Sequence, residues 1–442
     1  METKNVDVVV IGSGVAGAVA AARALDLGLK VMVVSKSQGA TAYSSGAVDL
    51  ADEKISEVPS SFADPLQRGE SWFKSAQRLM LTKIHHPYAR MGQKVQDIFE
   101  EALALFLDLS KDISWSLRED QHNHVLTTQM GTLKRCAMVP RTMLCEVASF
   151  QKQDEVGVVG LDNFKSFDPG SVVRMLNWIL KLSPQSHVAL NPFLVSPSAF
   201  GMRHWKSTFE AASDLDQGPN QDLFIQALKA ALREAASRVQ QLWFPPLLGI
   251  SKTEKLIQKM EKALEVKCKE MLAMPHSVPG LRLAHALSDG LSRRGAVQIK
   301  GTLKSYEIEQ RCLKNLTLMV EDKRTLTVHA KKVILATGRA LGGGMLTESA
   351  PVDSVFNLPL WTSRGPVGDR YPIDMTSESI EKEQEIFSMG LAYDDSLRPL
   401  DACGEVFATN LFAAGSILQG YDPAKEGTGM GVGILTGYIA AG

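Results

Sequence analysis

The sequence has no closely spaced pair of cysteines. Its 5 cysteines are scattered singly along 442 residues, at Cys136, Cys145, Cys268, Cys312 and Cys403. Iron–sulfur clusters and structural zinc sites normally need neighbouring thiolates, so neither is expected and no metal site is predicted. An odd, dispersed set of this kind indicates reduced thiols in the cytosol.

The chain also lacks an excess of charge of one sign and a long apolar run. Its 48 Lys and Arg residues nearly balance 49 Asp and Glu residues, which leaves no basic field for nucleic acid or anionic lipid. No uninterrupted apolar run reaches the roughly 20 residues that span a bilayer. The first residues, Met1 to Asn5, do not form a secretory signal. We therefore expect a cytoplasmic protein with no nucleic-acid partner and no membrane span of its own.

A glycine-rich turn stands near the N-terminus. The apolar run at residues 6–11 suits a strand buried in a parallel sheet, and it leads into Gly12, Gly14 and Gly17. In this spacing the first glycine permits a tight turn, the second lets phosphates approach the backbone, and the third lets helix and strand pack closely. An alanine-rich segment and a second apolar run at residues 30–34 follow. The pattern predicts a Rossmann-like nucleotide-binding domain.

The acidic residue that usually ends the second strand and binds a ribose hydroxyl is missing. Ser35 stands at that position and is followed by Lys36. A serine still makes a neutral hydrogen bond, about half as strong as a charge-assisted one. Ser35 is therefore a candidate nucleotide contact. Lys36 keeps an NADP-binding alternative open, because a lysine there can face a 2′-phosphate.

Two further stretches are typical of flavin-binding folds. Ser44, Ser45 and Gly46 follow the second strand and suit the close approach of a flat isoalloxazine ring. Gly338 ends a buried apolar run in an Ala-Thr-Gly sequence, where a glycine lets the chain pass near nucleotide phosphates.

The C-terminal end offers a second glycine-rich helix start. The last strand runs into Gly415, and the final helix opens around Gly429 and Gly431. Amides at a helix start favour negative charge, and a reduced flavin ring becomes anionic. Two such helix starts at opposite ends of the chain predict one long flavin nucleotide held at two points.

The middle of the chain has a different composition from its ends. Between residues 65 and 275 helical periodicity dominates, and it predicts helices over residues 95–109, 222–241 and 252–271, with one strand-like run at residues 157–161. We therefore predict an α/β fold in which residues 1–64 and 276–442 form a discontinuous flavin-binding domain. The inserted residues 65–275 are expected to form a mainly helical cap that contacts the substrate.

Taken together, these motifs resemble the B subunit of anaerobic glycerol-3-phosphate dehydrogenase. The stretches that carry the resemblance are residues 42–50, 159–169, 277–283, 410–416, 420–423 and 426–427. The resemblance implies a flavin subunit, usually assigned FMN, whereas the glycine fingerprint favours FAD. It also implies a second flavin subunit and a membrane-docked iron–sulfur subunit, which pass electrons from sn-glycerol 3-phosphate to quinone and hold the chain at the inner face of the membrane.

Oxidation of a secondary alcohol needs a base near the hydroxyl and cations for a phosphate. His276 and His285 are the candidate bases, and Arg282 is a candidate catalytic residue one helical turn before His285. Two alternatives stay open. One is a stand-alone flavin oxidoreductase acting on another hydroxy acid or an unsaturated acid. The other is an electron-relay or assembly subunit without substrate chemistry of its own.

Overall fold

The structure is a computed structural model of the whole chain. The residues that it describes are 2–52, 64–67, 69–90, 95–150, 154–162, 164, 166–183, 188–196, 206–235, 239–321, 323–347, 350–379 and 382–442. Among them, no helix has the length and apolar character that a bilayer-crossing segment requires.

The largest sheet has six strands drawn from both ends of the chain. Five strands pair in parallel in the order β11-β2-β1-β13-β19. The strand β12 pairs antiparallel with the second part of β11, residues 301–309, and with the first part of β13, residues 325–328. The strands are β1 (Glu2–Ile11), β2 (Val31–Ser35), β11 (Val297–Glu309), β12 (Cys312–Val320), β13 (Thr325–Leu335) and β19 (Leu411–Ala413). The predicted α/β fold is confirmed, with the first and last strands of the chain in one sheet.

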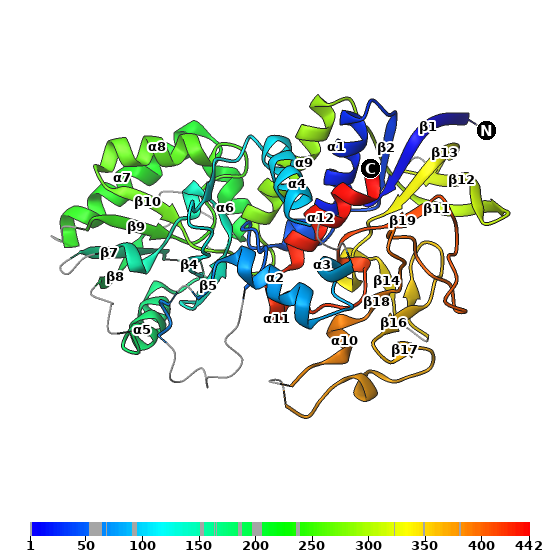
Figure 1. Ribbon diagram of the computed structural model, residues 1–442. Coiled ribbons are helices and arrows are strands. Elements are labelled where there is room, and N and C mark those ends of the chain that lie inside the picture. The colour runs from blue at the N-terminus through cyan, green and yellow to red at the C-terminus, as the bar shows by residue number, and fades with distance from the viewer. Residues whose placement is uncertain are drawn as a thin grey trace.

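Helices from distant segments lie against this sheet or against the helices that cover it, as Figure 1 shows around the blue N-terminal and red C-terminal helices. They are α1 (Val15–Asp26), α2 (Trp72–Thr82), α3 (Pro87–Arg90), α4 (Val95–Leu109), α9 (Val278–Arg293), α11 (Pro423–Glu426) and α12 (Gly429–Ala441). The apolar periodicity that predicts a helix over residues 95–109 gives the bounds of α4 correctly. These helices and the sheet enclose one continuous hydrophobic core.

The two ends of the chain pack directly on each other through α1 and α12. A Cβ atom placed on Gly437 would lie 2.3 Å from the carbonyl oxygen of Ala16, so only glycine allows this approach. One turn earlier, a Cβ atom on Gly433 would lie at an ordinary 3.6 Å from the amide nitrogen of Ala16. The termini therefore meet, as a single ligand held from both ends requires.

A second sheet lies in the middle of the chain, on the far side of α4 from the large sheet in Figure 1. Its four strands pair in parallel in the order β10-β9-β7-β8 and enclose a separate hydrophobic core. The elements of this part are β7 (Glu155–Leu161), α5 (Pro169–Leu180), β8 (Ala189–Val195), α6 (Thr208–Leu215), α7 (Gly218–Ala235), β9 (Gln241–Phe244), α8 (Thr253–Leu264) and β10 (Lys267–Glu270).

The sequence predicts only one of these four strands. Helical periodicity extends the predicted helices to residues 241 and 271, whereas α7 ends at Ala235 and α8 at Leu264. The strands that follow are four residues long, and β10 reads Lys-Cys-Lys-Glu. A run this short and polar carries no period-two signal, because its alternate residues are not apolar. The division of the chain at residues 64/65 and 275/276 stays a proposal.

Short hairpins connect the two sheets. These strands are β3 (Trp115–Leu117), β4 (His124–Thr127), β5 (Leu133–Cys136) and β6 (Met138–Pro140). β4 pairs antiparallel with β5, and β3 with β6. The isolated bridge between Val48 and Met138 ties this region to the segment that follows the second strand of the large sheet.

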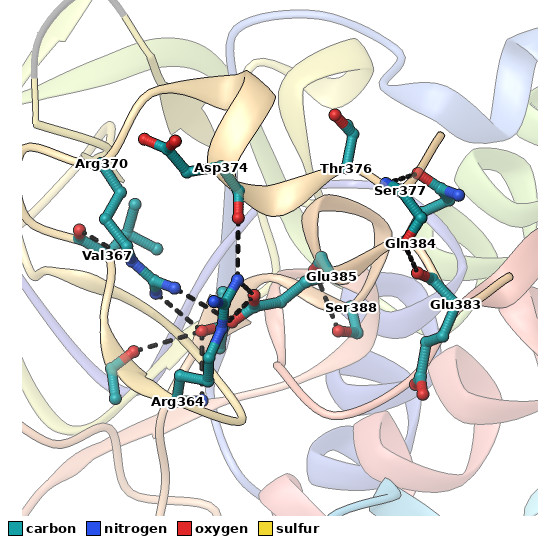
Figure 2. Close-up of polar contacts among 12 residues, drawn as sticks. Arg364, Val367, Arg370, Asp374, Thr376, Ser377, Glu383, Gln384, Glu385 and Ser388 are labelled. Atoms are coloured by element: carbon teal, nitrogen blue, oxygen red, sulfur yellow. Dashed lines mark hydrogen bonds and ion pairs between the residues drawn. The ribbon is translucent and has the colours of Figure 1, made fainter. Parts of the chain in front are cut away.

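The described residues between 345 and 391 form an excursion beside the large sheet. Its elements are β14 (Met345–Leu346), β15 (Val352–Asp353), β16 (Leu360–Thr362), β17 (Gly365–Pro366), α10 (Glu385–Ser388) and β18 (Gly390–Leu391). Figure 2 shows that Arg364 and Arg370 converge on Glu385. Arg364 Nε donates to Oε2 at 2.6 Å, and Arg370 Nη1 donates to Oε1 at 3.1 Å. Burial alone would raise the pKa of Glu385, but these hydrogen bonds lower it to about 2.

Candidate functional site

The first candidate anion site is the start of α1. Gly12 has a φ of +117°, and a Cβ atom on it would meet the carbonyl oxygen of Ala336 at 2.2 Å. The Thr41 hydroxyl accepts the amide of Val15 at 3.1 Å, which closes one side of the helix start. The amides of Ala16 and Gly17 have no acceptor among the described residues. Backbone donors are thus left for an anion at this end of α1.

A second cluster of predicted residues lies where β13 and β19 end. Gly338 and Gly415 both have positive φ, and a Cβ atom on Gly338 would touch the Ser416 hydroxyl at 3.4 Å. Arg339 Nε donates to the Ser416 carbonyl at 2.8 Å, which connects the segments that follow β13 and β19. The buried hydroxyl of Thr337 lacks a hydrogen-bond partner within the described part of the chain. A nucleotide fits here, because it brings acceptors to donors that the protein leaves free.

The start of α12 behaves differently from the sequence-based prediction at one residue. The amide of Gly431 is not free, since it donates to the Asp49 carbonyl at 2.9 Å. Gly431 instead permits packing, because a Cβ atom on it would lie 2.2 Å from the Tyr88 hydroxyl oxygen. The amides of Gly429 and Met430 meet no acceptor in the described ranges and are the ones that can face an anionic ring.

Helix α9 holds the loop that carries Ser44, Ser45 and Gly46. A Cβ atom on Gly46, whose φ is +83°, would lie 2.4 Å from the Cβ of Pro279 in the first turn of α9. Ser44 Oγ accepts the Gly46 amide at 3.3 Å, and Ser45 Oγ accepts the next amide at 3.4 Å. These hydrogen bonds shape the loop, and each serine keeps its hydroxyl proton for another acceptor. Ser35 is the last residue of β2, the strand that precedes this loop, and it pairs with Lys300 of β11.

A cavity of about 640 Å³ lies where three parts of the chain meet. Its lining includes Asp49 and Asp52, just after the serine–glycine loop, the β4–β5 hairpin residues 132–135, and Pro423 and Gly427 before α12. A volume of this size suits a small-molecule ligand. The cavity thus adjoins both the loop and the helix start predicted to hold a flavin ring.

Charged pairs line one wall of the cavity. Lys134 Nζ donates to Asp49 Oδ2 at 2.8 Å, and Arg135 Nη1 lies 3.9 Å from Asp52 Oδ1. Arg135 also donates through Nε and Nη2 to the Gln67 carbonyl, at 3.2 and 2.6 Å. Each of the two cations of β5 therefore lies near a carboxylate of the segment 49–52.

A buried polar cluster of Lys83, His86 and Glu426 adjoins residues 423–427, some of which line the cavity. Nε2 of His86 lies 3.2 Å from Oε2 of Glu426, and Lys83 Nζ donates to Oε1 at 2.5 Å. Burial lowers the pKa of His86. Burial alone would raise the pKa of Glu426, but His86 and Lys83 lower it overall. The Tyr88 hydroxyl donates to the Leu50 carbonyl at 2.6 Å, which fixes the start of the Asp49–Asp52 segment.

The predicted catalytic residues lie on and before α9. His285 Nε2 is 3.3 Å from Gln38 Nε2, and the His276 ring meets Tyr43 edge-on with centroids 5.9 Å apart. Arg282 pairs with buried Glu270 at 2.5 Å and donates to the Gly249 carbonyl at 2.8 Å. None of the three belongs to the described lining of the cavity.

Sequence reasoning missed Lys134, Asp49 and His86 as site residues. Asp49 and Glu426 stand inside the motifs that carry the resemblance, so their position was a usable signal. Lys134 and His86 stand outside those motifs, and neither has a partner at a recognisable motif spacing. Only the fold brings them beside carboxylates from distant segments.

Comparisons with known proteins show what this chain is similar to. Residues 7–168 match a family described as FAD binding domain. The chain is 26% identical to the B subunit of anaerobic glycerol-3-phosphate dehydrogenase from Vibrio vulnificus (strain CMCP6), covering 99% of this chain and 95% of that protein. It is 27% identical to the protein of the same name from Pectobacterium atrosepticum, covering 98% and 97%.

Solved structures that align with this chain include a flavocytochrome c3 fumarate reductase in its open conformation. Its TM-score is 0.42 at 10% identity, over 99% of this chain and 78% of that one. A 3-ketosteroid delta1-dehydrogenase from Sterolibacterium denitrificans has a TM-score of 0.40 at 13% identity, over 99% and 98%.

The flavin predicted from the glycine turns is thus confirmed, and of the two flavins considered FAD is the one that the family description names. The resemblance seen in the sequence is also confirmed. The chain is a flavin-dependent oxidoreductase with an FAD binding domain, similar over nearly its whole length to the B subunit of anaerobic glycerol-3-phosphate dehydrogenase.

Proposed function

We propose that this protein is the flavin subunit of a quinone-linked dehydrogenase that oxidises sn-glycerol 3-phosphate to dihydroxyacetone phosphate. The resemblance over nearly the whole chain supports the substrate. The observation that carries the proposal is the cavity of about 640 Å³ between the serine–glycine loop, the β4–β5 hairpin and the segment before α12. A small phosphorylated alcohol entering it would lie beside the flavin-binding loop.

The reaction removes two electrons and two hydrogens from a secondary alcohol. When bound, FAD accepts a hydride from the carbon that carries the hydroxyl. The protein has to hold that carbon still and accept the hydroxyl proton. His276 and His285 remain the proposed bases. Both lie beside the loop segment 38–43 and outside the described lining of the cavity, so either one can act only if the hydroxyl end of the substrate extends past the cavity toward that segment.

Arg282 remains a proposed member of the same machinery in a positioning role. Its guanidinium is held by Glu270 and by the Gly249 carbonyl. These contacts fix one face of α9, three residues before His285. Arg282 would therefore orient the helix that carries the proposed base.

Electrons have to leave the protein after each turnover. Among the described residues, no group of three or more metal-ligating side chains is placed to hold a cluster. We propose that a second flavin subunit and a membrane-docked iron–sulfur subunit receive the electrons and pass them to quinone. In that arrangement the chain is peripheral to the inner face of the cell membrane through its partners.

A reduction titration of the purified holoprotein tests the proposal. We expect sn-glycerol 3-phosphate to bleach the oxidised flavin band without oxygen, whereas glycerol does not. Bleaching by another hydroxy acid alone would instead support a stand-alone oxidoreductase. A flavin that dithionite reduces but no alcohol reduces would overturn substrate oxidation on this chain and leave an electron-relay or assembly role.

A further inference from the structure

We propose that the cavity beside β5 recognises a small polyol phosphate through two cations and the carboxylates near them. Lys134 and Arg135 bind the phosphate group, and Asp49 accepts a hydrogen bond from a hydroxyl group of the ligand. This assignment deepens the proposed function and rests on it for the identity of the substrate. It places recognition in the β4–β5 hairpin rather than on α9.

The two cations approach the cavity from a single strand. Lys134 and Arg135 are consecutive in β5, so their side chains leave the strand on opposite sides. Both nevertheless line the cavity, and each reaches the Asp49–Asp52 segment at a different point. An anion in the cavity would therefore be flanked by two positive charges.

Each cation keeps hydrogen-bond donors for a ligand. An ammonium group has three donors, and the hydrogen bond to Asp49 uses one of those of Lys134. A guanidinium has five donors, and Arg135 commits Nε and Nη2 to the Gln67 carbonyl. Its Nη1 is 3.9 Å from the Asp52 carboxylate, which is beyond hydrogen-bonding distance. Lys134 and the Nη1 group of Arg135 can therefore bind phosphate oxygens.

The carboxylates decide which anions are favoured. Asp49 Oδ1 is buried and has no hydrogen-bond partner within the described chain. Lys134, Arg135, Asp49 and Asp52 together bring no net formal charge to the cavity lining. Inorganic phosphate gains from the cations but is repelled by the aspartates. A ligand whose hydroxyl groups donate to Asp49 compensates for that repulsion, so a polyol phosphate binds more tightly than phosphate alone.

The chemistry predicts opposite effects for two substitutions on one wall. Lys134→Met removes a cation and should weaken binding of both inorganic phosphate and sn-glycerol 3-phosphate about tenfold. Asp49→Asn removes the competing negative charge, so binding of inorganic phosphate should strengthen. The same change replaces an ionised acceptor by a neutral one, so the preference for sn-glycerol 3-phosphate over phosphate should narrow.

The experiment is a calorimetric titration of the oxidised holoprotein with each of the two ligands. Wild type, Lys134→Met, Arg135→Met and Asp49→Asn are compared with Lys300→Met, an exposed cation on β11 paired with Glu321. Flavin content and melting temperature are recorded for every variant. Should one variant not fold, Arg135→Met and Lys134→Met each test the anion site independently.

The assignment is upheld if Lys134→Met and Arg135→Met lose affinity while Lys300→Met does not, and Asp49→Asn narrows the preference. It is overturned if the two cation variants bind both ligands like wild type, or if Asp49→Asn leaves the preference unchanged. Failure of the proposed function is a separate result. A wild-type protein that binds sn-glycerol 3-phosphate at these residues but is not reduced by it keeps the recognition site and loses the oxidation.

Discussion

Nε2 of His86 lies 3.2 Å from Oε2 of Glu426, although the two residues are far apart in the sequence. His86 Nδ1 accepts the amide of Tyr88 at 2.9 Å, so a neutral His86 ring carries its proton on Nε2, the nitrogen near the carboxylate. The Nε2–Oε2 contact does not have hydrogen-bond geometry, so it is a close polar contact between buried groups. Both side chains are buried, and Glu426 closely precedes Gly429, where the last helix begins. The contact therefore lies at the end of α11, directly before the start of α12 and its free amides.

Replacing Glu426 by glutamine should destabilise the protein by about 1 to 3 kcal/mol. The change removes the charge that binds Lys83 and faces His86, and a charged hydrogen bond in a buried site is worth about that much. Urea unfolding of the holoprotein measures the effect.

Glu321→Gln is the matched control, because Glu321 forms an ion pair with Lys300 in which both side chains are exposed. Its unfolding free energy should change by less than about 0.5 kcal/mol. Equal shifts for the two variants would contradict a special role for the buried Glu426 carboxylate.

The sequence predicts the flavin domain well because its signals are local. The residue spacing of Gly12, Gly14 and Gly17 and the apolar run before it are typical of one β-α-β unit, and β1, α1 and β2 form it. The sequence also predicts that the two ends of the chain meet around one ligand. It does not single out Gly437, through which α12 packs on the backbone of Ala16.

The substrate side could not be predicted in the same way. The pairing of Lys134 with Asp49 joins a hairpin of the middle region to the flavin loop, and neither residue has a periodic partner in the sequence. Gly431 shows a second limit. Its position at a helix start predicts a free amide, but the fold brings the Asp49 carbonyl to it. Tertiary contacts of this kind depend on the whole chain and leave no local pattern.

Gly437→Ala should destabilise the contact between the two ends of the chain. Its Cβ atom would lie 2.3 Å from the Ala16 carbonyl oxygen, and such overpacking against backbone typically costs about 1 to 3 kcal/mol or more. Loss of flavin should accompany the loss of stability, because α1 carries the proposed phosphate site. Thermal unfolding with and without added FAD measures both effects.

Gly433→Ala is the control for that substitution, one turn earlier on the same helix. Its Cβ atom would meet the Ala16 amide nitrogen at 3.6 Å, an ordinary contact. Alanine is the better helix former by about 1 kcal/mol, so stability should stay equal or rise. A comparable loss in both variants would show that α12 does not pack on α1 as described.

Gly14→Glu should give a folded but colourless protein. Gly14 has a φ of −69°, which any residue adopts, and a Cβ atom there meets only the Thr41 hydroxyl, at 3.2 Å. The new carboxylate would sit at the start of α1 and compete with the nucleotide phosphates for the same amides. The absorbance ratio of flavin to protein should fall at least about tenfold. Gly14→Ala should keep most of its flavin, and stoichiometric flavin in Gly14→Glu would contradict the placement of the phosphates.

The stability of the protein should fall in acid because of Glu385. Its pKa is about 2 in the folded protein, against 4.5 for an unperturbed glutamate. A depressed pKa means that the folded state binds the proton less readily than the unfolded state. The stabilisation is therefore fully present above about pH 4.5 and is lost as the pH falls toward 2. Its size is on the order of 3 kcal/mol at most.

Urea unfolding between about pH 6 and about pH 3 tests this in wild type and in Glu385→Gln. The variant should be less stable than wild type at the upper end of that range, since glutamine cannot pair with the two guanidinium groups of Arg364 and Arg370. The difference between the two proteins should shrink steadily below about pH 4.5, because wild type loses its charge there and the variant has none to lose. A difference that stays constant with pH would mean that these arginines do not lower the pKa of the Glu385 carboxylate. The polar contacts that Figure 2 shows would then add no pH-dependent stability to this part of the fold.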